Sequence, residues 1–234
     1  HGEILFDHVP PQDYLDYIAE DVKTWSYMKF PFFRSMGPAS GWYRVGPLAR
    51  VNACDFIDTP LAEEARQEFK EVGKGRPVHA SMAYHWARMI EALHAVEKIG
   101  ELLADPDLQS TDLTTSGPRR NEGIGVLEAP RGTLFHHYRV GDDDLVTLCN
   151  LIVSTTSNNE PMNRAVTSVA KKVLTGRTHI TEGMLNKVEV VIRAYDPCLS
   201  CATHAMGQMP LVVQVVDAGG RVVDEAVKGP EAGR

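Results

Sequence analysis

The chain has 234 residues, with 24 Lys and Arg side chains against 31 Asp and Glu side chains, so its formal net charge is −7. Hydrophobic residues occupy 43% of positions, an ordinary globular share that excludes a disordered tail or a fibrous repeat. The acidic balance argues against nucleic acid or an anionic membrane as the main partner. The longest apolar run, residues 211–216, is far shorter than the roughly 18 residues that a membrane span needs.

The chain opens on His1 and on a segment, HGEILFDHVPP, that has neither the basic start nor the apolar stretch of a secretory signal. We expect it to be a piece of a longer protein. Its four cysteines, at positions 54, 149, 198 and 201, are too few and too unevenly placed for a disulfide scaffold. The expected location is therefore a reducing compartment, the cytoplasm.

Three segments in the first half of the chain have clear local patterns. Thr59 and Pro60 begin a helix-start pattern, which predicts a short surface helix over residues 59–71 with Thr59 as its cap. The polar stretch 105–122 is predicted to be a surface loop. A long amphipathic helix is predicted over residues 78–103, because apolar side chains recur there every three or four positions: Met82, Trp86, Met89, Ile90, Leu93, Val96, Ile99 and Leu103.

The second half of the chain alternates strand and helix patterns. Two β-rich arms, 125–140 and 145–155, flank a Gly-Asp turn and predict a hairpin. Residues 160–174, which end before Gly176, and residues 181–194 predict two helices. Val-rich runs on either side of residues 218–220 predict a second, self-contained hairpin. The expected fold is mainly α-helical with small β hairpins.

The sharpest chemical motif is DPCLSCATH at residues 196–204, directly after the last predicted helix. Two thiols two residues apart can bind one metal ion from a single turn, and thiolates favour soft or borderline metals. The spacing alone leaves open a structural zinc site, a redox dithiol or two buried cysteines. No second CxxC or histidine pair of the zinc-finger type accompanies it. A thioredoxin-like site would open a helix after a strand, whereas this motif follows a helix.

Three motifs together resemble those of a known family. GPLAR at residues 46–50, EAPRG at 128–132 and DPCLSCATHA at 196–205 occur in the same order as in the large subunit of nickel–iron hydrogenases. The resemblance covers essentially the whole chain and is similar to the C-terminal half of that subunit. The last motif resembles the cytosolic, cofactor-coupled branch, and most of all the bidirectional NAD-reducing enzyme. The implied architecture is the helical core of the large subunit.

The resemblance implies a nickel–iron centre whose iron carries two cyanides and one carbon monoxide. Cys198 would be a terminal nickel ligand, and Cys201 would bridge nickel and iron, both as thiolates. His204 would bind a structural magnesium or similar divalent ion, to which the backbone carbonyl of Leu151 would be a further ligand. Thr155 would donate a hydrogen bond to an iron cyanide.

The resemblance also implies catalytic roles for Arg131, Cys198 and Asp196. Arg131 would lie over the open position between the metals, where its permanently protonated guanidinium can polarise hydrogen. Asp196 would hold that side chain by a charge-assisted hydrogen bond. Glu128 and Pro130 of the same EAPRG segment would surround the site. Taken alone, Arg131 would be interpreted as a surface arginine, and only its place in the motif reverses that interpretation.

The implied activity is reversible oxidation of dihydrogen to protons and electrons. Electrons would pass to a small subunit with iron–sulfur clusters and then to a module that holds FMN and reduces NAD(P). The alternatives are a hydrogenase with a deazaflavin or heterodisulfide-linked acceptor, a non-catalytic relative of the complex I type, or a hydrogen sensor. The family's N-terminal RxCGxC motif is absent from this sequence. The isolated chain is therefore expected to be inactive.

Residues 205–234 continue past the final histidine of the metal motif. In the family, maturation removes whatever follows that histidine, so the resemblance implies a core of residues 1–204 and a cleavable extension of residues 205–234. A processing endopeptidase would cut between His204 and Ala205, after nickel-insertion chaperones have loaded the site.

Several other residues have simpler interpretations. His136 and His137 occupy adjacent positions of a predicted strand, so they point to opposite faces and both can be ordinary packing residues. The isolated thiols Cys54 and Cys149 are predicted to be buried and structural. The histidines of the long predicted helix segment are expected to be satisfied by local partners: His79, His85 and His94.

Overall fold

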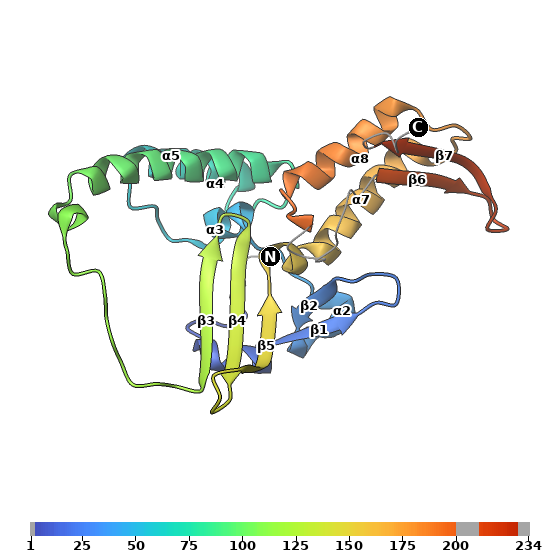
Figure 1. Ribbon diagram of the computed structural model, residues 1–234. Helices are drawn as coiled ribbons and strands as arrows, with labels where there is room; N and C mark the ends of the chain where they lie inside the picture. Colours follow the sequence, from blue (N-terminus) through green and yellow to red (C-terminus); the bar gives the residue numbers. More distant parts are fainter. Residues whose placement is uncertain (1–2, 200–210, 229–234) are drawn as a thin grey trace, which may run out of the picture.

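The computed structural model describes residues 3–199 and 211–228, and this part of the chain is mainly helical with three small antiparallel sheets, as predicted (Figure 1). Within these residues no helix is both long and apolar enough to cross a membrane. The helices are α1 (Tyr14–Tyr17), α2 (Gly37–Ser40), α3 (Pro47–Ala53), α4 (Pro60–Gly73), α5 (Ala83–Leu103), α6 (Ser154–Ser157), α7 (Asn159–Leu174) and α8 (Glu182–Ala194), with short 3-10 turns η1 (Pro11–Asp13), η2 (Arg34–Met36) and η3 (Pro106–Gln109). The strands are β1 (Ile18–Val22), β2 (Lys29–Phe33), β3 (Glu122–Ala129), β4 (Gly132–Val140), β5 (Val146–Ile152), β6 (Leu211–Val216) and β7 (Val222–Lys228).

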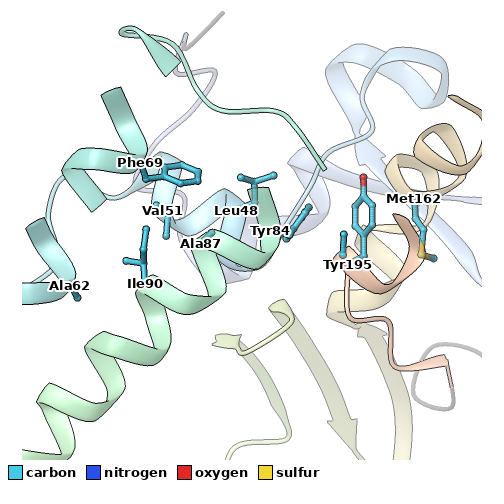
Figure 2. Close-up of a cluster of buried hydrophobic side chains, with 10 residues drawn as sticks. Leu48, Val51, Ala62, Phe69, Tyr84, Ala87, Ile90, Met162 and Tyr195 are labelled. Carbon is cyan, nitrogen blue, oxygen red and sulfur yellow. The ribbon is translucent and has the colours of Figure 1, made fainter. Parts of the chain in front are cut away.

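The main core lies between α3, α4 and α5 and continues to α7 and α8 (Figure 2). The prediction of a surface helix near residue 60 is wrong in its exposure, because α4 buries Ala62 and Phe69 completely. Arg66, one turn from each, is also buried, and its charge is neutralised by Glu63 through two 2.7 Å hydrogen bonds. A small residue, an ionic residue and one aromatic residue share this face, which explains why the sequence pattern did not indicate burial.

The start of α4 is stabilised from another helix. Thr59 precedes the first turn as predicted, but its side chain does not cap the helix and instead lies 3.0 Å from Nδ1 of His94. Glu97 of α5 accepts hydrogen bonds from the backbone N–H groups of Leu61 and Ala62, at 3.0 and 2.9 Å. A carboxylate at a helix N-terminus satisfies donors that the helix itself leaves unpaired. The predicted boundary is therefore confirmed, and the predicted cap is wrong.

The long predicted helix is confirmed as α5, although it begins at Ala83 and not at position 78. Its buried face is formed by Tyr84, Ala87 and Ile90. Most of the predicted apolar stripe is exposed on the described part of the chain, with Met89 at 68% and Leu103 at 69%. The period of the pattern identified the helix, but the core contacts a different face of it.

The predicted hairpin of the second half is a three-stranded sheet, in the order β3-β4-β5 (Figure 1). The turn at Gly141 joins β4 to β5 as predicted, but the first arm is itself a hairpin, in which Ala129 pairs with Gly132. Pro130 and Arg131 form its two-residue tip, which lies close to α3. Because Arg131 stands at this tip, the extra turn places it at the centre of the molecule.

Inward and outward positions alternate along β5. Ile152 points inward and is 1% exposed, whereas Cys149, three positions earlier, is exposed. The prediction of a buried Cys149 is therefore wrong, because a residue on the odd positions of this strand faces away from the core. Cys54 is half-buried at the end of α3, and burial raises the pKa of its thiol.

The last helices and the C-terminal hairpin are confirmed. Gly176, with φ of 75°, follows α7, and the backbone of Thr181 precedes α8. Strands β6 and β7 pair as predicted and lie beside α7 and α8 in Figure 1. Asp224 of β7 accepts a 2.7 Å hydrogen bond from the backbone N–H of Ile180, and His179 lies 3.3 Å from the same carboxylate. The hairpin is thus attached to the loop between the two helices.

Candidate metal centre

The GPLAR and EAPRG segments meet backbone to backbone. Gly46, with φ of 91°, packs so closely on the next segment that a Cβ there would lie 2.7 Å from the carbonyl oxygen of Arg131. Gly132, with φ of 136°, packs in the same way on Val45, whose Cγ2 would lie 2.3 Å from an added Cβ. Glycine at both positions permits this approach and these left-handed φ values. The contact fixes the tip of the β3–β4 hairpin against the start of α3.

Glu128 and Pro130, the other predicted residues of EAPRG, both contact Arg50 of GPLAR. The Glu128 carboxylate accepts a hydrogen bond from Nη1 of Arg50 at 2.7 Å and another from the Thr133 hydroxyl. The carbonyl oxygen of Pro130 accepts from Nη2 of Arg50 at 2.9 Å. The two motifs are therefore joined by side chains as well as by backbone.

Arg131 and Asp196 form an ion pair across 65 residues of sequence. Nε of Arg131 donates to the backbone carbonyl of Asp196 at 2.8 Å and lies 3.1 Å from its Oδ2. Asp196 has φ of 49°, so its backbone is left-handed at the point where the chain leaves α8. The two side chains are 43% and 48% exposed, and a charge pair at such a surface contributes under about 1 kcal/mol to stability. The pair thus serves to orient Arg131 far more than to hold the fold.

The short helix α6 connects the Arg131 turn to the cysteine segment. The backbone N–H of Cys198 donates to Oγ1 of Thr155 at 3.0 Å, and Thr155 is 4% exposed. The neighbouring Ser154 donates its hydroxyl to the carbonyl oxygen of Gly132 at 2.8 Å. A threonine hydroxyl that accepts one bond still has its own proton to donate. Thr155 therefore fixes the backbone of Cys198 and retains a donor next to it.

Sequence reasoning missed the buried polar run that contains Thr155. All six residues from Ser154 to Asn159 are buried. Asn158 binds the residue before Gly46 from both sides, since its Oδ1 accepts from the Val45 N–H at 3.0 Å and its Nδ2 donates to the Val45 carbonyl at 3.4 Å. The signal in the sequence is a polar hexapeptide, STTSNN, directly after an apolar strand.

Two tyrosines behind the site keep their protons. Burial raises the pKa of Tyr43 to about 12, and its hydroxyl lies 3.3 Å from that of Ser157. Burial also raises the pKa of Tyr84, which donates to the carbonyl of Val45 at 3.0 Å. Neither group can release a proton near neutral pH.

The predicted metal ligands divide between described and undescribed parts of the chain. Cys201, His204 and Ala205 lie outside the described residues. Leu151 lies on β5 opposite His136, and Cys198 stands beside Arg131 and Asp196 in the chain's course. The part that the structure describes contains no group of three or more His, Cys, Asp and Glu side chains able to hold a metal ion. A cysteine with a fixed backbone, next to a guanidinium, still fits the soft-donor chemistry of nickel.

The neighbouring histidines of β4 are occupied by local hydrogen bonds. His137 is 7% exposed, with Nδ1 3.2 Å from the Tyr14 hydroxyl and Nε2 2.8 Å from Glu122. His136, on the opposite face, has Nδ1 3.1 Å from the Tyr138 hydroxyl.

Comparison with known proteins assigns the class. A family model for nickel-dependent hydrogenases matches residues 7–204, so the chain belongs to the nickel-dependent hydrogenase family. It is 54% identical over 219 residues to the NAD-reducing hydrogenase HoxS subunit beta of Cupriavidus necator, a match that covers 92% of this chain and 45% of that protein. It is 44% identical over 221 residues to an iron-sulfur subunit of the F420-non-reducing hydrogenase of Archaeoglobus profundus, covering 91% and 45%.

Solved structures agree with this assignment. An NAD+-reducing [NiFe]-hydrogenase in the H2-reduced state superposes with a TM-score of 0.81 and 56% identity, covering 86% of this chain and 44% of that one. The Ni-Fe-Se hydrogenase of D. vulgaris Hildenborough, 21% identical with a TM-score of 0.58, shares the fold. The chain spans less than half the length of these relatives.

The glycine contacts generate a first prediction. Gly132→Ala is expected to lower the free energy of unfolding by about 1–3 kcal/mol, because the added methyl group overlaps Val45. Gly123→Ala, on the neighbouring strand with nothing within 4 Å, is the matched control and is expected to stay within about 0.5 kcal/mol. Denaturant unfolding of both variants measures the difference. Equal stabilities would show that the turn is not tightly packed.

Proposed function

We propose that this chain contributes to the catalytic subunit of a nickel–iron hydrogenase that reversibly oxidises dihydrogen. The observation that carries the proposal is the convergence of Arg131, Asp196 and Cys198 on one place, from motifs 65 residues apart. A charged guanidinium held beside a thiol and a buried hydroxyl is a suitable setting for heterolytic cleavage of a small apolar molecule.

The proposed ligands are the two cysteines and two magnesium-binding groups. Cys198 would bind nickel, Cys201 would bridge to iron, and His204 with the Leu151 carbonyl would bind magnesium. Such a centre, when bound, supplies Lewis-acid polarisation of dihydrogen. Two further thiolates would come from outside this sequence, because Cys54 and Cys149 lie elsewhere in the fold.

The residues of this chain would manage protons and charge at that centre. Arg131 keeps its proton and presents it to the reacting position, and Asp196 fixes the orientation of the guanidinium. Sγ of Cys198 would accept the proton released when dihydrogen is cleaved. The Thr155 hydroxyl would donate to an iron cyanide while its oxygen holds the Cys198 backbone.

The proposed electron route leads through an iron–sulfur small subunit to a module that holds FMN and reduces NAD(P), in the cytoplasm. Support comes from the relative in Cupriavidus necator and from the solved structure with 56% identity, both named as NAD-reducing. The relative in Archaeoglobus profundus is named for a hydrogenase that does not reduce F420. Its 44% identity makes a different acceptor the second candidate.

The test is metal analysis with infrared spectroscopy of the full-length parent protein, purified with its partners. We expect nickel and iron together with cyanide and carbonyl stretching bands. Zinc alone, without those bands, would make Cys198 and Cys201 a structural clip and would remove the catalytic proposal.

Arg131→Lys probes the guanidinium within the complete enzyme. The charge survives this substitution but the planar fork does not, so we expect turnover per nickel to fall by at least about tenfold. Arg139→Lys, on the same strand and paired with Glu122 at the surface, is the matched control and should keep the parental turnover. Turnover is measured as hydrogen oxidation with an artificial acceptor. Parental turnover in Arg131→Lys would exclude Arg131 from the mechanism.

We further propose that residues 205–234 are an extension removed by a processing endopeptidase after nickel insertion by chaperones. The β6–β7 hairpin is a separate unit attached through Asp224, which supports this division from the core of residues 1–204. Co-expression with and without the maturation proteins, followed by intact-mass analysis, should show loss of a fragment that begins at Ala205. Loss of any other fragment would contradict the proposed cut after His204.

A further inference from the structure

The guanidinium of Arg50 is saturated by acceptors from two other segments. Its Nε and Nη2 donate to the two oxygens of Glu91 on α5, both at 2.7 Å. Its Nη1 donates to Glu128 at 2.7 Å and to the Ala129 carbonyl at 2.8 Å, and Nη2 donates again to the Pro130 carbonyl at 2.9 Å. A guanidinium has five N–H donors in a rigid fork, so every one of them is used.

Three of the five acceptors belong to the residues that directly precede Arg131. A planar fork with fixed donor directions constrains the carbonyls of residues 129 and 130 in angle as well as in distance. Glu91 holds the opposite edge of the same fork, and it belongs to the long helix of the core. The position of the turn is therefore referred to α5 through one side chain.

The remaining sides of the turn are also held. The Arg131 carbonyl packs on Gly46, and the Gly132 carbonyl accepts from Ser154 at 2.8 Å. The backbone from 129 to 132 is thus fixed on each side. The Arg131 side chain extends from this fixed backbone to Asp196.

Arg50 contributes geometry and not a proton. Burial opposes its charge, but hydrogen bonds to Glu91 and Glu128 outweigh that effect and raise the pKa of Arg50 above its ordinary value. A group with so high a pKa stays protonated throughout the range in which enzymes work. Any effect of Arg50 on turnover must therefore act through the position of Arg131.

We propose that Arg50 is a positioning residue for the hydrogenase reaction, which sets the location of the Arg131 guanidinium through the carbonyls of Ala129 and Pro130. The inference rests on the proposed function for its catalytic consequence. Displacing a reacting group by about 1 Å costs up to about 100-fold in rate. Arg50 is therefore expected to affect turnover without touching the substrate.

The alternative is that Arg50 only stabilises the fold, and Arg66 provides a matched control for that role. Arg66 also binds one carboxylate with two N–H groups, Glu63 at 2.7 Å, and donates to two backbone carbonyls, those of Cys54 at 3.2 Å and Asp55 at 2.7 Å. It is 2% exposed, and none of these contacts reaches the Arg131 turn. Replacing it removes a comparable network elsewhere in the same core.

The experiment compares Arg50→Lys and Arg66→Lys in the full-length parent protein with its partners. We expect Arg50→Lys to lower kcat per bound nickel by about 10- to 100-fold, with a smaller change in KM for dihydrogen and an altered pH profile. Arg66→Lys should lower the midpoint of thermal unfolding but keep the parental kcat per nickel and pH profile. Amide hydrogen exchange gives a readout without metal, and residues 128–133 should exchange faster in Arg50→Lys only.

Glu91→Gln is the milder second variant if Arg50→Lys does not fold or load nickel. It keeps one acceptor for the fork and weakens the other, so a smaller fall in kcat and faster exchange at residues 128–133 are expected. Parental kcat per nickel, pH profile and exchange in these variants would overturn the inference. Absence of hydrogen oxidation and of cyanide bands in the unmodified protein would instead contradict the proposed function, while the exchange comparison still tests the clamp.

Discussion

The contact between the backbones of Gly46 and Arg131 is the constraint on which the site depends. Two segments 85 residues apart can approach this closely only because neither Gly46 nor Gly132 carries a side chain. Asn158 holds the chain just before Gly46, and Ser154 holds the carbonyl of Gly132. Once this junction is formed, α3, α6 and the β3–β4 hairpin have one relative placement. The Arg131 side chain then has a fixed starting point.

Local patterns predicted the elements whose signals are local. Helices α7 and α8 and the β6–β7 hairpin could be predicted because caps, glycine stops and alternating valines lie within each segment. The turn at Pro130 and Arg131 was missed because it lacks the Asn-Gly or Asp-Gly pair of a common hairpin. The depth of α4 was missed because Arg66 looks like a surface residue until Glu63 is placed beside it.

The candidate site was predictable only in part for a related reason. Arg131, Asp196, Thr155 and Cys198 could be named from motif resemblance, and the structure brings their segments together. Arg50 could not be assigned a contact, because its partners Glu91 and Glu128 lie 41 and 78 residues away in sequence. The α5 stripe and the half-exposed Arg131 pair are open to solvent on the described residues. The proposed function accounts for both features, because it places the chain within a larger assembly.

The left-handed backbone of Asp196 separates two properties that one residue must combine. Asp and Asn tolerate a φ of 49° far better than longer side chains do, and only Asp also supplies a negative charge to Arg131. Asparagine at this position would therefore preserve the path of the chain into Cys198 and remove the charge. Glutamate would preserve the charge and strain the path. The site thus allows electrostatics and chain direction to be varied one at a time, at a single residue.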